Sequence, residues 1–106
     1  MKTAILIIAA LLCTSAAHAE KGARLSGDEV CKDWGDFAVR VMTMRQKQTP
    51  MHETMATIPA TGNIGAYKAI VMDAYESRSY TQKDMQDQSI ASFRNTVELA
   101  CYKRPK

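Results

Sequence analysis

Apolar residues recur at spacings of three and four positions along several stretches of this chain, which is the pattern of amphipathic α-helices. The first stretch extends from about Asp28 to about Gln48. Its apolar stripe comprises Cys31, Trp34, Ala38, Val41 and Met42. Ser26 or Asp28 can cap the first backbone amides, and acidic residues suit the positive end of a helix. The pattern therefore predicts a first helix over 28–48.

A proline interrupts the pattern after this helix. Residues 51–58 have room for a short second helix, with Thr49 as its cap and Pro50 at its first helical position. Residues 59–63 read Pro-Ala-Thr-Gly-Asn, which is the composition of a turn. We therefore expect a short helix followed by a change of direction.

Two more helices are expected in the second half of the chain. Helical spacing of apolar residues returns over 64–76. The last helix should begin at a cap formed by Thr81, which Asp84 completes as a capping box, and should end near Tyr102. After residue 19 there is no sustained alternation of apolar and polar positions, as strands would require. The predicted fold class is all-α, a small bundle of three to four helices.

Residues 1–19 have the pattern of a cleavable signal peptide. A lysine precedes an apolar run over 4–12, which is shorter than the roughly 20 residues that a membrane span needs. The Ala-His-Ala that ends at Ala19 offers small residues to a signal peptidase, so cleavage is expected there. A lipoprotein acylated at Cys13 is the alternative, but Leu12 stands where that site needs a small residue. The expected protein is periplasmic or secreted, without a lasting membrane anchor.

Cleavage leaves a single domain with two cysteines. Residues 20–27 contain two glycines and no periodicity, so they are expected to form a flexible lead-in to a helical domain over 28–106. Cys31 and Cys101 are an even pair in an exported chain, which indicates a disulfide; two free buried thiols are the alternative. They fall in the first turn of the first helix and the last turn of the last one. A bond between them requires the start of the domain to lie against its end, which suits antiparallel packing of these two helices.

The charge distribution narrows the choice of partner. The chain has 14 basic and 11 acidic residues, and the basic ones are scattered except for a cluster over 103–106. Nucleic-acid binding needs a basic stripe, which this distribution lacks. The small size, the disulfide and the methionine and tyrosine content favour a protein partner in the periplasm or outside the cell.

Arg45 is the most informative single residue, because it projects into the apolar stripe of the first helix, where a guanidinium must find partners. It either binds a ligand carboxylate or phosphate in a cleft, extends to solvent at the helix end, or pairs with an acid inside the protein. The candidate acids are Asp73, Glu76 and Glu98.

Aromatic residues supply three further binding candidates, Trp34, Tyr75 and Tyr80. Half-buried aromatics with a polar edge at the surface are common anchors of binding faces. Core packing explains them equally well.

The methionines allow a metal hypothesis. The chain has seven, and Met51 with Met55 can present two sulfurs on one helical face beside His52. Thioethers are soft ligands that suit Cu(I), so a copper or small-ligand carrier is the alternative function. Methionine also fills irregular gaps in cores, which is the structural explanation. No cofactor is expected on the main interpretation.

No catalytic residue is predicted. His52 is the only histidine after the signal peptide, and no serine or cysteine motif accompanies it. The acid pairs Asp33 with Asp36 and Asp84 with Asp87 lie on polar helix faces, whereas catalytic acids need a cleft. The sequence therefore does not indicate an enzyme.

Short motifs support one resemblance. They are the Met-Thr-Met-Arg-Gln of 42–46, Ala74-Tyr75 followed by Tyr80, and Phe93 with a closing Cys101. In these features the chain resembles a loose group of small exported bacterial proteins of uncharacterised function, some of them phage-associated. In that group a proline often follows the Ala-Tyr pair, whereas here 76–79 reads Glu-Ser-Arg-Ser. The resemblance implies export and a disulfide, and no activity.

A second likeness exists at the level of fold. The acid-stress chaperones of the enteric periplasm are similar in combining a signal peptide, an all-helical domain and one disulfide. The cysteine pair is the only motif shared with them. A likeness of fold does not carry a function with it. The small size, the disulfide, the methionine and tyrosine content and the absence of a catalytic motif favour a protein-binding module of the chaperone or inhibitor type.

Overall fold

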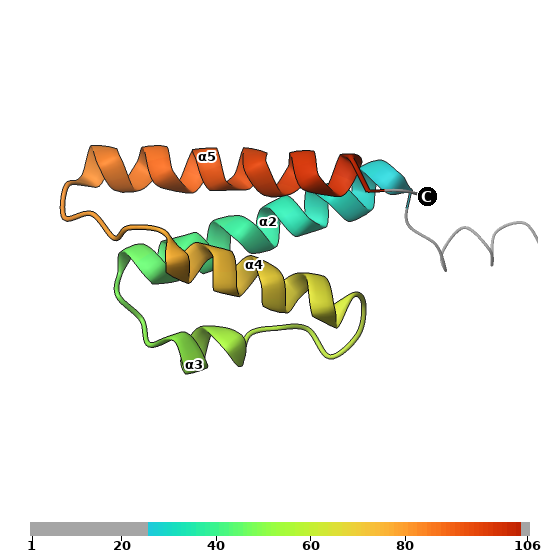
Figure 1. Ribbon diagram of the computed structural model, residues 1–106, viewed down its shortest axis with the longest axis horizontal. Coiled ribbons are helices and arrows are strands. Elements are labelled where there is room, and N and C mark those ends of the chain that lie inside the picture. The colour runs from blue at the N-terminus through green and yellow to red at the C-terminus, as the bar shows by residue number, and fades with distance from the viewer. Residues whose placement is uncertain (1–25, 105–106) are drawn as a thin grey trace, which may run out of the picture.

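The computed structural model describes residues 26–104, and within this range it contains four helices and no strand (Figure 1). They are α2 (Gly27–Gln46), α3 (Met51–Met55), α4 (Ile64–Glu76) and α5 (Lys83–Tyr102). The predicted all-α fold class is confirmed. The predicted signal peptide and residues 20–25 of the lead-in lie outside the described residues. Among those described, no helix combines the length and the apolar character that crossing a bilayer requires.

Helix α2 begins at a capping box that its own sequence supplies. The Ser26 hydroxyl accepts the Glu29 N–H at 3.1 Å, and the Glu29 carboxylate accepts the Ser26 N–H at 2.9 Å. These bonds satisfy amides that the first helical turn leaves without partners. The helix starts at Gly27, so the predicted boundary of the lead-in at 27–28 falls just inside it.

Helix α2 ends two residues earlier than predicted, at Gln46. Gln48 adopts a φ of 63°, in the left-handed region, which a right-handed helix cannot continue. The Gln48 N–H donates to the Arg45 carbonyl and the Thr49 N–H donates to the Met44 carbonyl, both at 2.9 Å. This is the Schellman arrangement, in which backbone carbonyls of the last turn find donors.

Helix α2 is the centre of the bundle, because α5 and α4 both pack along it (Figure 1). Its buried face is correspondingly wide. Helices α2 and α5 are antiparallel, and a disulfide joins Cys31 to Cys101 with their Cα atoms 5.5 Å apart. The predicted disulfide and the predicted antiparallel packing are confirmed. The core consists of Cys31, Trp34, Phe37, Ala38, Val41, Met42, Ile70, Val71, Ala74, Phe93, Val97 and Cys101.

The short helix α3 is three residues shorter than the predicted 51–58. Thr57 and Ile58 donate to carbonyls three residues back, at Thr54 and Met55, so the chain tightens into turns there. Pro50 occupies the N-cap position, and no side chain caps the helix. The predictions of a Thr49 cap and of Pro50 at the first helical position are therefore wrong.

Helix α4 has the predicted bounds, because its local signals are strong. The Asn63 side chain accepts the Ala66 N–H at 3.0 Å, and Gly62 before it has a φ of 99°, which favours glycine.

Helix α5 begins at Lys83, and the predicted capping box of Thr81 and Asp84 is wrong. Gln82 is the N-cap residue and makes no side-chain cap bond. Asp84 is then the second helical residue, where a capping box needs its acid at the third.

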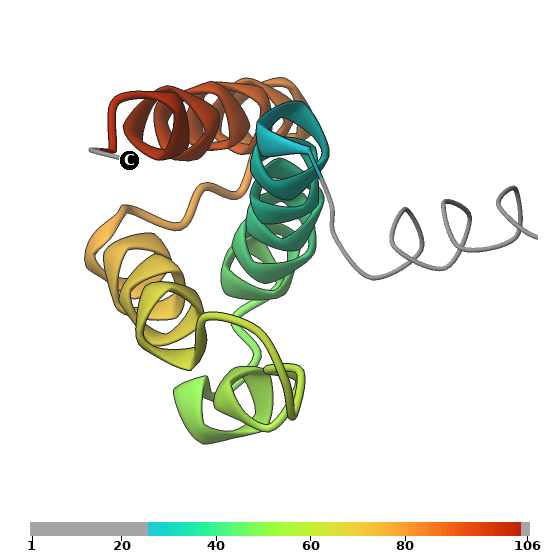
Figure 2. The same cartoon turned by 90° about the vertical axis from the view of Figure 1, so that its right-hand side faces the viewer.

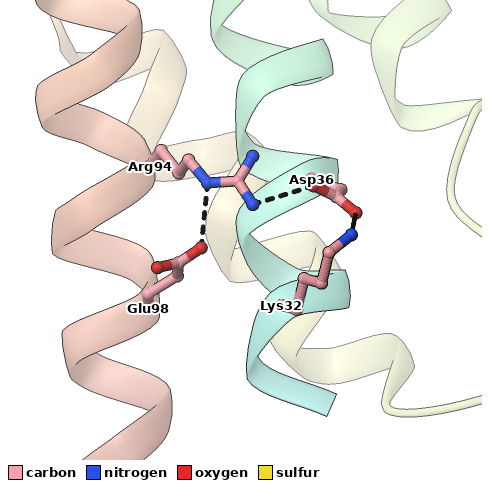
Figure 3. A network of polar contacts seen from close by, with 4 residues as sticks. All are labelled: Lys32, Asp36, Arg94 and Glu98. Carbon is pink, nitrogen blue, oxygen red and sulfur yellow. Dashed lines mark hydrogen bonds and ion pairs between the residues drawn. The ribbon is translucent and has the colours of Figure 1, made fainter. Parts of the chain in front are cut away.

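Charged side chains tie α2 to α5 on the surface (Figure 3). Arg94 pairs with Asp36 of α2 at 2.8 Å and with Glu98 of α5 at 2.9 Å, and Lys32 donates to Asp36 at 2.9 Å. The hydrogen bond from Lys32, and then that from Arg94, hold the pKa of the Asp36 carboxyl below its ordinary value. Gly35 lies beside this network: its backbone is so close to Glu98 that a Cβ added at this position would collide with the Glu98 carboxylate.

Candidate functional site: a valley between α4 and α5

Helices α4 and α5 each pack on α2 but make few contacts with each other, and Figure 2 shows them spaced apart. Two hollows lie between them. One, of about 590 Å³, is next to the link over 77–82, and the other, of about 400 Å³, is next to Asn63 and Arg104. Asp73 lines both hollows, so they form one continuous surface. We name it the valley; its edges are Ala66, Asp73 and Glu76 of α4 and Ser92, Thr96 and Ala100 of α5.

The floor of the valley is apolar. Helix α2 contributes Trp34 at one end and Met42 at the other. Between them lie Ile70 of α4 and Phe93 and Val97 of α5, which are also core residues. Each of these floor residues is at most 8% exposed, so the core comes close to the surface here, with no fourth long helix above it among the described residues.

The walls of the valley consist largely of small side chains. On α5, Ser89, Ser92, Thr96 and Ala100 recur at spacings of three and four, and all of them line it. On α4, Ala66 and Ala69 are three residues apart and also line the valley. Larger side chains at these positions would fill the space, so the small ones keep the valley open and allow a backbone to approach.

Exposed apolar residues continue the valley at its rims. Met72 is 50% exposed and lies three residues after Ala69 and four before Glu76, both of which line the valley. Leu99 is 55% exposed and lies three residues after Thr96. Residues three and four apart are neighbours on a helix, so both side chains lie next to lining residues, although neither lines a hollow itself. They extend its apolar surface beyond the floor.

The two ends of the valley differ in charge. Asp73 and Glu76 are exposed near the link, and neither belongs to an ion pair of the described residues. At the other end the Arg104 guanidinium lies over the Trp34 ring, 4.5 Å from its centroid. The valley is thus acidic toward the link and basic toward the C-terminal end of α5.

The link over 77–82 is held by side chains from α2 and α5. Arg45 Nε donates to the Ser77 carbonyl at 3.0 Å, and the Gln46 amide donates to the Arg78 carbonyl at 2.9 Å. Gln46 also accepts the Tyr80 N–H at 2.8 Å. These bonds fix Tyr80, whose side chain lines the valley.

Arg45 does not line the valley, and it forms no ion pair with any of the three acids considered from the sequence. Its guanidinium holds the link and lies 5.4 Å from the centroid of the Tyr75 ring. Of the three candidate acids, Glu98 pairs with Arg94, and Asp73 and Glu76 line the valley. Of the alternatives for Arg45, the internal ion pair with these acids is therefore not formed, and at the helix end the guanidinium instead meets the backbone carbonyl of Ser77.

Two of the four candidate binding residues line the valley, namely Trp34 and Tyr80. Tyr75 instead supports the fold: its hydroxyl donates to the Thr49 carbonyl at 2.7 Å and lies 2.7 Å from the Thr54 hydroxyl. Because the Tyr75 hydroxyl donates its single proton to the Thr49 carbonyl, the buried Thr54 hydroxyl is the donor to the Tyr75 oxygen. Tyr75 thus connects α4 to the segment that contains α3.

The three residues of the metal hypothesis lie in α3, away from the valley. Met51 and His52 are exposed, whereas Met55 is half-buried and packs against the core. Within residues 26–104, no three or more His, Cys, Asp or Glu side chains come together as a metal site would need.

The valley offers carboxylates, hydroxyls and amides above an apolar floor. Sequence reasoning missed Asp73 and Glu76 as surface charges, and it missed the small residues of α5. The spacing of Ser89, Ser92, Thr96 and Ala100 was the available signal. A scan against protein-family models, a search of curated proteins and a search of solved structures each give no match.

Proposed function

We propose that this protein is exported, loses residues 1–19, and acts in the periplasm or outside the cell as a small protein-binding module of the chaperone or inhibitor type. The valley is the observation that carries the proposal. Protein interfaces combine apolar residues at the centre with polar residues around them, and the valley has the same arrangement. The proposed role is binding, without catalysis.

The shape of the valley favours a protein over a small ligand. It follows the whole of α4, which has 13 residues and is therefore about 20 Å long. Small-ligand sites are usually clefts that bury most of the ligand surface. Here the exposed side chains of Met72 and Leu99 lie on the rims, where only a larger partner would cover them.

Photo-crosslinking in the native cells tests this function. A benzoylphenylalanine at Ser92 lies in the valley, whereas one at Ala91, the exposed neighbour on α5, points away from it and is the matched control. We expect a defined protein adduct from position 92 and none from position 91. Added unlabelled wild-type protein should compete for the partner and reduce the adduct. Equal adducts from both positions, or none from position 92, would contradict the proposal.

Mass spectrometry of the exported protein tests the compartment separately. We expect a chain that begins at Glu20 and contains the Cys31–Cys101 bond. An intact Met1, or an acylated Cys13 at the N-terminus, would show that the processing proposal is wrong without bearing on the valley.

A further inference from the structure

We infer that the partner enters the valley as one amphipathic helix, with its apolar face on the floor and a lysine or arginine directed to Asp73 and Glu76. This inference rests on the proposed function and specifies the chemistry of the partner.

A helix is the element that the arrangement of α2, α4 and α5 can accommodate. These three long helices provide three positions of a four-helix bundle, and the valley lies where the fourth would pack. Packed helices approach to about 8–10 Å between axes, and small side chains at the contact favour the close end of that range. The walls supply such side chains, among them Ala69 and Ser92. An added strand would need a sheet edge, and residues 26–104 contain no strand.

The length and apolar character of the partner follow from the valley itself. A helix as long as α4 has about 13 residues, or nearly four turns. Apolar side chains on one face would cover Trp34, Ile70 and Val97 of the floor, and neighbouring ones would reach Met72 and Leu99 at the rims.

Charge complementarity selects a basic residue on the partner helix. Asp73 and Glu76 are three residues apart and therefore neighbours on α4, both line the valley, and neither is used in an ion pair of the described residues. The facing wall of α5 is uncharged, since it presents Gln88, Ser89 and Ser92. A cation on the partner therefore has only these two carboxylates to meet at that end, and an anion there would be repelled.

Stapled peptides of 14 residues, with alanine and leucine on one face, are the probes for this inference. The first carries a lysine on the apolar face near one end, and the second has glutamate at that position and is otherwise identical. Trp34 is the only tryptophan of the chain and lines the valley, so its fluorescence reports occupation. Anisotropy of a fluorescein on the peptide measures affinity independently. The protein is the purified exported form with its disulfide intact.

We expect the lysine peptide to bind about tenfold more tightly than the glutamate peptide at low salt, because attraction replaces repulsion at an exposed site. The difference should shrink at high salt. The double variant Asp73→Asn, Glu76→Gln should abolish it. The double variant Asp84→Asn, Asp87→Asn is the matched control, because it removes the same charge from two exposed acids spaced three apart outside the valley. It should preserve the difference.

The outcomes separate this inference from the proposed function. Equal affinities for the two peptides, equal loss of discrimination in both double variants, or no binding of either peptide would overturn the basic helix as partner. In each of these cases an adduct from position 92 would still support the valley as the binding surface. Circular dichroism of each variant verifies that it is folded.

Discussion

The side-chain carbonyl of Gln46 accepts the backbone N–H of Tyr80 at 2.8 Å, so the last residue of α2 fixes the link between α4 and α5. The same side chain donates to the Arg78 carbonyl at 2.9 Å. Gln46 is only 4% exposed, and its amide is therefore satisfied entirely inside the protein. This arrangement holds Tyr80 at the end of the valley.

Replacement of Gln46 by leucine is expected to lower the free energy of unfolding by about 2–3 kcal/mol, because the N–H of Tyr80 and the carbonyl of Arg78 lose their partner. Urea denaturation followed by circular dichroism measures this loss. Lys47→Leu, at the exposed neighbour, is the control and should change stability by less than about 0.5 kcal/mol. A similarly small change for Gln46→Leu would mean that the link is held by other contacts.

Replacement of Gln48 by glycine is expected to stabilise the protein by about 0.5–1 kcal/mol. Gln48 has a φ of 63°, where a side chain is strained and glycine is not. Lys47 has a φ of −86°, so Lys47→Gly relieves no strain and should be neutral or destabilising. Thermal and urea unfolding of both variants measure the change in stability. Equal changes for Gln48→Gly and Lys47→Gly would contradict the prediction.

Gly35 and Glu98 should be energetically coupled. A Cβ at Gly35 would displace the Glu98 carboxylate and weaken its bond to Arg94, which offsets the gain of alanine over glycine in a helix. In a Glu98→Ala background the obstacle is gone, and Gly35→Ala should stabilise by about 1 kcal/mol. A double-mutant cycle measures the coupling. Equal effects of Gly35→Ala in both backgrounds would contradict the close approach.

Asp36 should make the stability of the protein sensitive to acid. Its pKa is lowered in the folded state by the hydrogen bonds from Lys32 and Arg94, while in the unfolded state it takes its ordinary value of about 4. Its contribution is therefore fully present above that value and is lost as the pH falls through the lower, folded pKa.

The expected result is that the stability difference between the wild type and Asp36→Asn narrows steadily as the pH falls below about 4. NMR titration of the Asp36 carboxyl, with unfolding measured across the same range, checks this. Lys32→Met should raise the pKa of Asp36 toward its ordinary value. A constant difference at all pH values would show that the ion pairs do not favour the charged carboxylate.

The existence and order of the four helices were predicted from the sequence, but only some of the local capping signals were interpreted correctly. Helix α4 has its expected bounds because Asn63 and Gly62 act within a few residues of its start. The disulfide was predicted from the even pair of cysteines that remains after the expected cleavage, and the structure confirms it. The end of α2 differs from the predicted one because Gln48 takes a left-handed conformation that is unusual for glutamine. The start of α5 differs because Gln46 and Gln86 hold the backbone around Tyr80. Those are tertiary contacts, which periodicity does not contain.

The candidate site was predictable only in part, for a similar reason. Helical spacing placed Trp34 and Arg45 on one stripe, but it does not say which neighbour each meets. Trp34 lines the valley, whereas Arg45 reaches the Ser77 carbonyl at the helix end. The valley exists because α4 and α5 both contact α2 and scarcely contact each other, which is a property of the assembled bundle.

The Cys31–Cys101 bond closes a covalent ring between residues 70 positions apart. Helices α3 and α4 and most of α2 and α5 lie within this ring. Turns such as 59–63 are where proteases cut most readily. A single cut there would open the ring and still leave one covalently connected molecule, with α2 and α5 stapled together. A pulling force applied before Cys31 and after Cys101 would pass through the disulfide, so the part of the valley formed by residues 34–100 is shielded from tension, whereas Arg104 lies outside the ring.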